Sequence, residues 1–278
     1  MHRVAFIKPD RTPIPQPTTV IRGGHNKKTQ EVPAKQRMSP DEKRARVERI
    51  RQHQALANQR KEDAKRAASN PNFNPYQYGS IESIWKNETV YIVAGGSSLS
   101  GFDFNKLKGK KVIAINKAFM YVPFADYLYW TDTRFYLWYK SEIDNLKCKK
   151  VTASTNPKDL KDDVILLRNS GSRMIDMAND RITSGNNSGF GALNLALKLG
   201  ASKIYLLGYD MKYTNNRAHF HDGYPSGSNN REHIYAGMVR YFEDNAHLIN
   251  EMAEVYNTNP DSSLTCFKFC SLDDALAS

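Results

Sequence analysis

The chain has 278 residues, 40% hydrophobic and 25% charged, with a formal net charge of +11, a composition typical of a soluble globular protein. No apolar run approaches the roughly 18–20 residues of a membrane helix, and the first residues lack the apolar core of a signal peptide. The three cysteines (Cys148, Cys266 and Cys270) form no CxxC pair. We therefore expect a cytoplasmic protein without a disulfide framework or a cysteine-based zinc site.

The positive charge is concentrated in the first part of the chain. Residues 1–80 hold 17 Lys and Arg against 7 Asp and Glu, a net charge of +10 out of the total of +11. Residues 1–38 are rich in Pro, Thr, Gln and Lys and show no apolar periodicity. This composition predicts an extended or disordered basic arm.

A helix that faces solvent or a partner is expected over 39–69. Ser39 suits an N-cap, Pro40 suits the first helical position, and Glu42 completes a capping box. The apolar stripe is too thin to form a core of its own. Four arginines lie on this segment: Arg44, Arg46, Arg49 and Arg51. They could bind the phosphates of a nucleic acid or an acidic protein surface, or they could form an ordinary solvated face.

Residues 70–87 are the expected linker, and residues 88–278 are expected to form one α/β domain. Short apolar runs alternate with helix-like segments, which predicts a Rossmann-like, mostly parallel sheet with helices on both faces. The predicted helices cover 188–200 and about 231–256. The predicted strands cover 90–95, 111–116, 126–132, 150–154, 163–167, 203–208 and 265–269. Ligands of such sheets bind at the carboxyl ends of the strands, so polar residues just beyond those ends are the candidate site.

The first candidate is the loop that follows the strand at 90–95. Gly95, Gly96, Ser97 and Ser98 would let a phosphate approach backbone N–H groups at the start of a short helical turn. Gly and Ser are also ordinary turn residues. The loop matches neither the GxGxxG dinucleotide fingerprint nor a P-loop with its lysine, so both interpretations stay open.

Polar residues at three further positions follow a predicted strand or open a predicted helix. Asn116 could read a base or sugar edge, or serve as a turn residue. Asp132 could contact a ribose or an acceptor, or it could cap the segment "TRFYLWY". Ser188 opens the helix at 188–200, where Gly189 permits a close approach of the backbone.

The last candidate is the polar segment "GYDMKYTNNRAHFHDGYP", which contains Tyr213, His219 and His221. Two histidines two residues apart suggest a metal, but no carboxylate or thiol with ligand spacing completes the set, so we expect no metal site. One histidine would instead act as a general base, because imidazole titrates near neutral pH. Ordinary surface-loop histidines are the alternative.

Two stretches resemble the bacterial sialyltransferases that use CMP-sialic acid. In "IVAGGSSLSGFDFNKLKGKKVIAIN" a strand, a Gly-rich loop, an Asp-aromatic element and a strand ending in Asn follow one another as in that family. "RITSGNNSGFGALNLALKLGASKIYLLGYDM" resembles its Thr-Ser-Gly loop, Ala-rich helix and Lys-x-Ile-Tyr-Leu strand. The same Rossmann-like unit occurs in archaeal 6-hydroxymethylpterin diphosphokinases, flagellin-glycosylating motility proteins and phage proteins. The resemblance covers roughly residues 88–270.

This resemblance implies a nucleotide-sugar glycosyltransferase with a CMP-sugar donor and a hydroxyl acceptor, which inverts the sugar carbon and requires no metal or cofactor. The nucleotide would be bound by Gly95, Gly96, Ser97, Ser98, Asn116, Ser188 and Gly189. His219 or His221 would act as the base, and Tyr213 would stabilise the leaving phosphate.

Two departures from the family leave other functions open. Ser97 replaces the family's Pro, and Lys212 stands where the family has Tyr, with Tyr213 one position later. The alternative is a non-enzymatic component of a large assembly such as a phage virion. Its residues 1–70 would dock on protein subunits or nucleic acid, in the host cytoplasm or the virion. A third hypothesis, pyrophosphoryl transfer to a pterin-like substrate, would need Mg²⁺ on carboxylates such as Asp126, Asp132 and Asp210.

Overall fold

The computed structural model describes residues 77–155, 157, 159–214, 217–225 and 232–277, all within the unit Asn74–Ser278. The predicted arm (1–38) and the predicted helix (39–69) lie outside the described residues, as do Arg44, Arg46, Arg49 and Arg51. In the described part of the predicted linker, Ile81 and Trp85 are buried and pack in the core of the unit.

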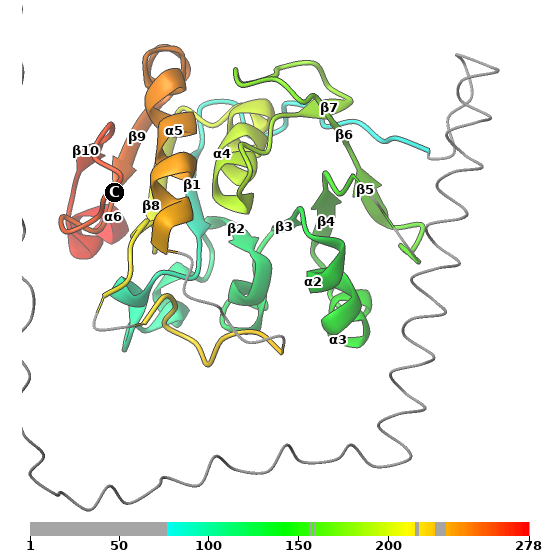
Figure 1. Ribbon diagram of the computed structural model, residues 1–278, viewed down its shortest axis with the longest axis horizontal. Coiled ribbons are helices and arrows are strands. Elements are labelled where there is room, and N and C mark those ends of the chain that lie inside the picture. The colour runs from blue at the N-terminus through cyan, green and yellow to red at the C-terminus, as the bar shows by residue number, and fades with distance from the viewer. Residues whose placement is uncertain (1–76, 156, 158, 215–216, 226–231, 278) are drawn as a thin grey trace, which may run out of the picture. The chain divides into compact units, whose positions relative to one another are not determined.

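Within the described residues, a parallel eight-stranded sheet forms the centre of this unit (Figure 1). Its order is β10-β9-β8-β1-β2-β3-β4-β5. The strands are β1 (Thr89–Val93), β2 (Lys111–Ile115), β3 (Tyr127–Trp130), β4 (Lys149–Thr152), β5 (Val164–Leu166), β8 (Lys203–Leu207), β9 (Glu254–Asn257) and β10 (Lys268–Phe269). The chain runs outward from β1 to β5 and returns on the other side of β1 as β8. The strand order therefore reverses between β1 and β8, and the predicted Rossmann-like α/β class is confirmed.

Helices cover both faces of the sheet because the strands are apolar on both faces. Ile92 of β1 lies opposite Ile113 of β2 and Leu206 of β8, and this face packs against α4 (Ser188–Leu199) and α5 (Glu232–Met252). The other face, with Tyr91 and Val93, packs against the remaining helices. These are η1 (Ser97–Leu99), η2 (Phe104–Leu107), η3 (Asn116–Met120), α2 (Thr133–Trp138), α3 (Lys140–Asp144) and α6 (Leu272–Ala277).

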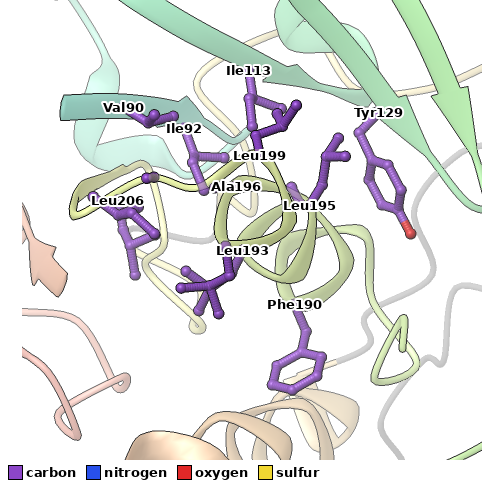
Figure 2. Close-up of a cluster of buried hydrophobic side chains, with 14 of the residues drawn as sticks. Val90, Ile92, Ile113, Tyr129, Phe190, Leu193, Leu195, Ala196, Leu199 and Leu206 are labelled. Carbon is purple, nitrogen blue, oxygen red and sulfur yellow. The ribbon is translucent and has the colours of Figure 1, made fainter. Parts of the chain in front are cut away.

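Helix α4 lies directly on the sheet, with Leu195, Ala196 and Leu199 close to β1 and β2 (Figure 2). Burial of each such leucine contributes about 1.5–3 kcal/mol. A Cβ atom on Gly191 would lie 2.6 Å from a ring carbon of Tyr129, so a glycine is required for this close contact. The close seating of α4 fixes where its N-terminus meets the edge of the sheet.

The structure differs from the predicted elements at the C-terminal side. The helix predicted to about 256 ends at Met252, and β9 begins at Glu254. The Glu254 amide donates to the Ser202 carbonyl, which places this residue beside β8 as part of a strand. Strand β10 covers only the last two residues of the run predicted at 265–269. Strands β6 (Arg168–Asn169) and β7 (Arg181–Ile182) form a separate pair that was not predicted.

Candidate functional site

A cavity of about 360 Å³ opens at the carboxyl ends of β1, β2, β3 and β8, where the strand order reverses. Small-molecule sites in proteins have volumes of this order. The predicted site residues that line it are Gly95, Gly96, Asn116, Asp132, Ser188, Gly189, Tyr213 and His219. Lining residues that were not predicted include Thr131, Arg134, Trp138, Asn187, Tyr209 and Tyr235.

The glycine- and serine-rich loop after β1 is tied to a carboxylate at the end of β8. Asp210, which is buried, accepts hydrogen bonds from the Ser98 amide (2.8 Å), the Ser98 hydroxyl (2.5 Å) and the Ser97 hydroxyl (3.3 Å). Ser97 and Ser98 are therefore turned to Asp210, while Gly95 and Gly96 line the cavity. The amide that a phosphate would meet at Ser98 already binds an anionic group of the protein itself.

Gly96 is required by packing whether or not a ligand binds. Its amide donates to the Gly208 carbonyl at 2.9 Å, and a Cβ atom at this position would lie 2.6 Å from Cγ of Asp210. Any side chain would push the loop away from β8. The role of Gly96 as a turn residue is thus enough to explain why a glycine stands there. Gly95 differs, because it faces the imidazoles of His219 and His221.

A second polar cluster joins the ends of β2 and β3 to the start of α4. The Ser188 hydroxyl lies 3.0 Å from the Thr131 hydroxyl and donates to Oδ1 of Asn116 at 3.3 Å. Asn116 has a left-handed backbone (φ 48°), which asparagine tolerates better than most residues. Asn187 caps α4 by accepting from the Phe190 amide at 2.7 Å. The N-terminal end of α4, with its partial positive charge, therefore meets the cavity at Ser188 and Gly189.

Two cations and one exposed carboxylate lie on the cavity wall. Asp132 caps α2 by accepting from the Arg134 amide (2.8 Å), and its carboxylate pairs with the Arg134 guanidinium (2.6 Å). The capping role considered for Asp132 is thus confirmed. Lys212 also lines the cavity, and no acidic group among the described residues pairs with it. Tyr213 lies beside Lys212 with its ring edge-on to Tyr235, 5.9 Å between centroids.

The two histidines of the loop after β8 stack on each other, but only one faces the cavity. The rings of His219 and His221 are 4.7 Å apart and nearly parallel, and the Tyr224 ring meets both edge-on. His219 lines the cavity. Burial, assisted by the charge of Lys117, lowers the pKa of His219 below its usual 6.5, although a hydrogen bond to the Gly95 backbone opposes the shift. His219 is therefore a neutral imidazole near neutral pH.

His221 lies behind His219 and is buried. Its Nδ1 accepts from the Gly223 amide at 3.1 Å, and its Nε2 has no hydrogen-bond partner among the described residues. Burial and the neighbouring His219 lower the pKa of His221 to about 3. Of the two candidates for a general base, only His219 is placed where a substrate in the cavity could reach it.

The sequence did not predict the positions of three residues at the site. Asp210 ties the glycine loop to β8, Thr131 completes the cluster with Ser188, and the buried Lys117 bonds to the histidine loop. Thr131 directly follows a strand and could have been found from that signal. Lys117 could not have been found in this way, because lysines are mostly exposed and Asn116 was already the candidate polar residue at the end of this strand.

Among the described residues, no three His, Cys, Asp or Glu side chains gather as a metal site would require. The three carboxylates considered for Mg²⁺ have other partners: Asp126 accepts from the Val112 amide (2.8 Å), Asp132 pairs with Arg134, and Asp210 binds Ser98. In the same part of the chain, no helix is long and apolar enough to cross a membrane.

The strand order defines a Rossmann-like α/β domain, and its cavity lies at the edge of the sheet where ligands of such domains bind. No protein-family model and no curated protein matches the chain. It is similar to the solved structure of the MAf glycosyltransferase from Magnetospirillum magneticum AMB-1 (TM-score 0.50, 14% identity), over 70% of this chain and 35% of that one. This chain thus spans about a third of that protein's length, and the similarity is one of fold.

A second solved structure is the sialyltransferase CstII from Campylobacter jejuni, in complex with the substrate analogue CMP-3FNeuAc. It matches with a TM-score of 0.36 and 14% identity, over 66% of this chain and 85% of that one.

Proposed function

We propose that the protein is a glycosyltransferase that transfers a sugar from a CMP-sugar donor to a hydroxyl acceptor with inversion, without a metal cofactor. The observation that carries this proposal is that a neutral imidazole, His219, and the N-terminus of α4 line the same cavity. A base and an anion-binding helix end are the two groups that such a transfer requires. The choice of a CMP-sugar rests on the resemblance of the segments around Gly95 and Ser188 to the sialyltransferases.

The donor phosphate binds, in this proposal, between the Gly95–Gly96 backbone and the start of α4. Ser188 and Gly189 lie in the first turn of α4, where amides have no partner within the helix. Lys212 adds a positive charge without an acidic partner in the described residues. Ser97 and Ser98 contribute indirectly, because their bonds to Asp210 hold the glycines in place.

The nucleoside is read by the cluster at the ends of β2 and β3. The side-chain amide of Asn116 and the hydroxyls of Thr131 and Ser188 form one hydrogen-bonded group. Such groups can exchange their mutual bonds for bonds to a ribose or a base edge. Asp132, which pairs with Arg134 at the rim, contacts the ribose or the acceptor.

His219 removes the acceptor proton. Its Nδ1 is the ring nitrogen at Gly95, which leaves Nε2 as the nitrogen that can accept a proton. The acceptor oxygen forms a bond to the anomeric carbon as its proton passes to Nε2. The bond from that carbon to the phosphate oxygen breaks, and CMP leaves with the electron pair, stabilised by Lys212 and Tyr213. Attack opposite the leaving group inverts the sugar carbon.

A transfer assay tests this proposal. The full chain is incubated with CMP-sialic acid and a galactoside acceptor, with and without EDTA, and released CMP is measured. We expect CMP release that depends on the acceptor, survives EDTA and is lost in His219→Asn. Failure of the wild-type chain to release CMP with any CMP-sugar would overturn the enzyme proposal.

The charge of the first 80 residues favours one second candidate, an assembly component that binds partners through its basic arm. Residues 1–80 carry nearly all of the net charge, although they include the residues outside the described part of the chain. Replacing Arg44, Arg46, Arg49 and Arg51 by alanine in the full chain tests this. If the arm binds nucleic acid, the variant loses DNA affinity, and the slope of log K against log salt concentration falls in magnitude by up to about 3–4. If the arm docks on subunits, DNA affinity is unchanged and the co-purifying protein is lost.

A further inference from the structure

Lys117 is an unusual residue at the site because it is a buried lysine. It directly follows Asn116 at the end of β2, and only 9% of its side chain is exposed. Its ammonium pairs with Asp222 and donates to the Gly223 carbonyl at 2.9 Å. Lysines are almost never buried unless they are paired. These two bonds, with the Tyr139 ring 5.9 Å from the ammonium, account for the position of Lys117.

Asp222 and Gly223 both belong to the loop that carries the two histidines. The Phe220 amide donates to the Gly95 carbonyl at 3.0 Å, which attaches one end of this loop to the glycine loop. The Gly223 amide donates to Nδ1 of His221, and the carbonyl of the same Gly223 accepts from Lys117. Lys117 thus attaches the other end of the loop to η3, which directly follows β2, and the stacked imidazoles lie between the two attachments.

We propose that Lys117 is a positioning residue for the reaction: its bonds to Asp222 and Gly223 hold the His219 imidazole against Gly95 on the cavity wall. This inference rests on the proposed role of His219 as the base. It assigns to Lys117 no contact with substrate, because Lys117 does not line the cavity. We therefore expect loss of Lys117 to change the environment of His219 and to have little effect on the binding of the donor.

The charge of Lys117 also contributes to the state of His219. The groups that face His219 are Lys117, Asp210, His221, Tyr224 and the Gly95 backbone. Of these, the Lys117 charge adds to burial in lowering the pKa of His219, whereas Asp210 and the Gly95 backbone raise it. Lys117 itself stays charged: burial lowers its pKa, but the hydrogen bond and charge of Asp222, together with Tyr139, outweigh burial and raise the pKa above its usual value.

The ion pair alone is a weak tether, since the Asp222 side chain is 84% exposed and exposed pairs stabilise little. The carbonyl bond and the buried stem of Lys117 therefore carry most of the attachment. Lys117→Met removes the charge and the carbonyl bond but keeps the stem. Lys117→Gln removes the charge and keeps a donor for the Gly223 carbonyl.

The test is an NMR titration of the imidazoles in the full chain. The chain has 7 histidines, and His219→Asn assigns the resonance of interest. We expect Lys117→Met to raise the pKa of His219 by at least about 0.5 units, and Lys117→Gln to raise it in the same direction. Lys150→Met is the matched control, because Lys150 is also buried and paired with an acid, Asp163, but lies on β4 away from the histidines; it should leave the His219 titration unchanged.

The binding of CMP separates this inference from the proposed function. If the wild-type chain binds no CMP but Lys117→Met still shifts the His219 titration, the proposed function fails, and what stands is only that Lys117 sets the environment of the His219 imidazole. If CMP binds, we expect its affinity in Lys117→Met to stay within about twofold while kcat falls tenfold or more. An unchanged His219 titration in the folded Lys117 variants would overturn the inference. Should Lys117→Met not fold, Lys117→Gln decides by the same criterion.

Discussion

Replacing Asp210 by asparagine tests the tie between the glycine loop and β8. The Asp210 carboxylate accepts four hydrogen bonds: Ser98 N and Ser97 Oγ at Oδ2, and Ser98 Oγ and Asn259 Nδ2 at Oδ1. Asparagine keeps the size of the side chain but replaces one oxygen by an NH₂ group. Hydroxyl groups can rotate to accept from that NH₂, whereas the amides cannot.

Whichever oxygen is replaced, one donor is left facing another donor. An NH₂ at the Oδ2 position meets the Ser98 amide, and an NH₂ at the Oδ1 position meets the Asn259 amide. Asn259 cannot simply flip, because its Oδ1 accepts from the Asp261 amide at 3.0 Å. A buried hydrogen bond to a charged group contributes about 1.5–3 kcal/mol, and an unsatisfied buried donor costs about 1–3 kcal/mol. We therefore expect Asp210→Asn to reduce the free energy of unfolding by about 2–4 kcal/mol.

Urea unfolding followed by circular dichroism measures this change, and thermal unfolding should show a Tm lowered by about 5–15 °C. Asp132→Asn is the matched control. It is also a cavity-lining aspartate that bonds a backbone amide, but it caps a helix at an exposed position, where asparagine serves about equally well. An Asp210→Asn protein within about 0.5 kcal/mol of wild type would show that Asp210 does not hold the loop, and the structural basis of the phosphate-site proposal would be lost.

Four further predictions concern the cavity and its histidines. Ser188→Ala should weaken CMP binding about tenfold in calorimetry, because it removes the hydroxyl that joins Asn116 and Thr131; equal Kd values would contradict the nucleoside site. Lys212→Met should weaken CMP binding and flatten its dependence on salt, since it removes a charge, and an unchanged salt dependence would argue against a phosphate contact. The transfer rate should fall on acidification only below pH 6.5, because the lowered pKa of His219 keeps the base unprotonated to lower pH; an acid limb above pH 6.5 would show that another group is the base. The pKa of His221 is about 3 in the folded chain, so below pH 6.5 the unfolded chain protonates His221 while the folded chain does not. The free energy of unfolding should therefore fall by about 1.4 kcal/mol for each pH unit below 6.5. Urea unfolding at pH 6.5 and pH 5 should show a smaller fall in His221→Phe than in the wild type.

The sheet could be predicted from the sequence because its strands are apolar on both faces and end in glycine or polar residues. β1, β2 and β8 fall where the runs at 90–95, 111–116 and 203–208 place them. β9 was missed because its four residues follow α5 after a single residue and carry no turn signal of their own. β6 and β7 have two residues each, too few for a periodicity to show.

The gathering of the site residues could also be predicted, because parallel strands end at one edge of the sheet. Gly95, Asn116 and Ser188 meet at one cavity for that reason. The bonds of Ser97 and Ser98 to Asp210 could not be foreseen. They join loops more than 100 positions apart, so neither loop's local sequence shows whether a serine faces a ligand or a carboxylate of the protein.

The same limit applies to the two histidines. Their spacing is compatible with either residue facing the cavity, and the difference arises from contacts with Gly95, Lys117 and Tyr224. Those contacts depend on how the loop after β8 returns over the ends of β1 and β2.

The most direct test of the proposed function is calorimetric titration of the full chain with CMP, with UMP, GMP and ATP as comparisons at the same salt concentration. We expect CMP to bind with a micromolar Kd, about −8 kcal/mol, and the other nucleotides to bind at least tenfold more weakly. Absence of binding by all four nucleotides would contradict the assignment of the cavity at Gly95 and Ser188 as a nucleotide site.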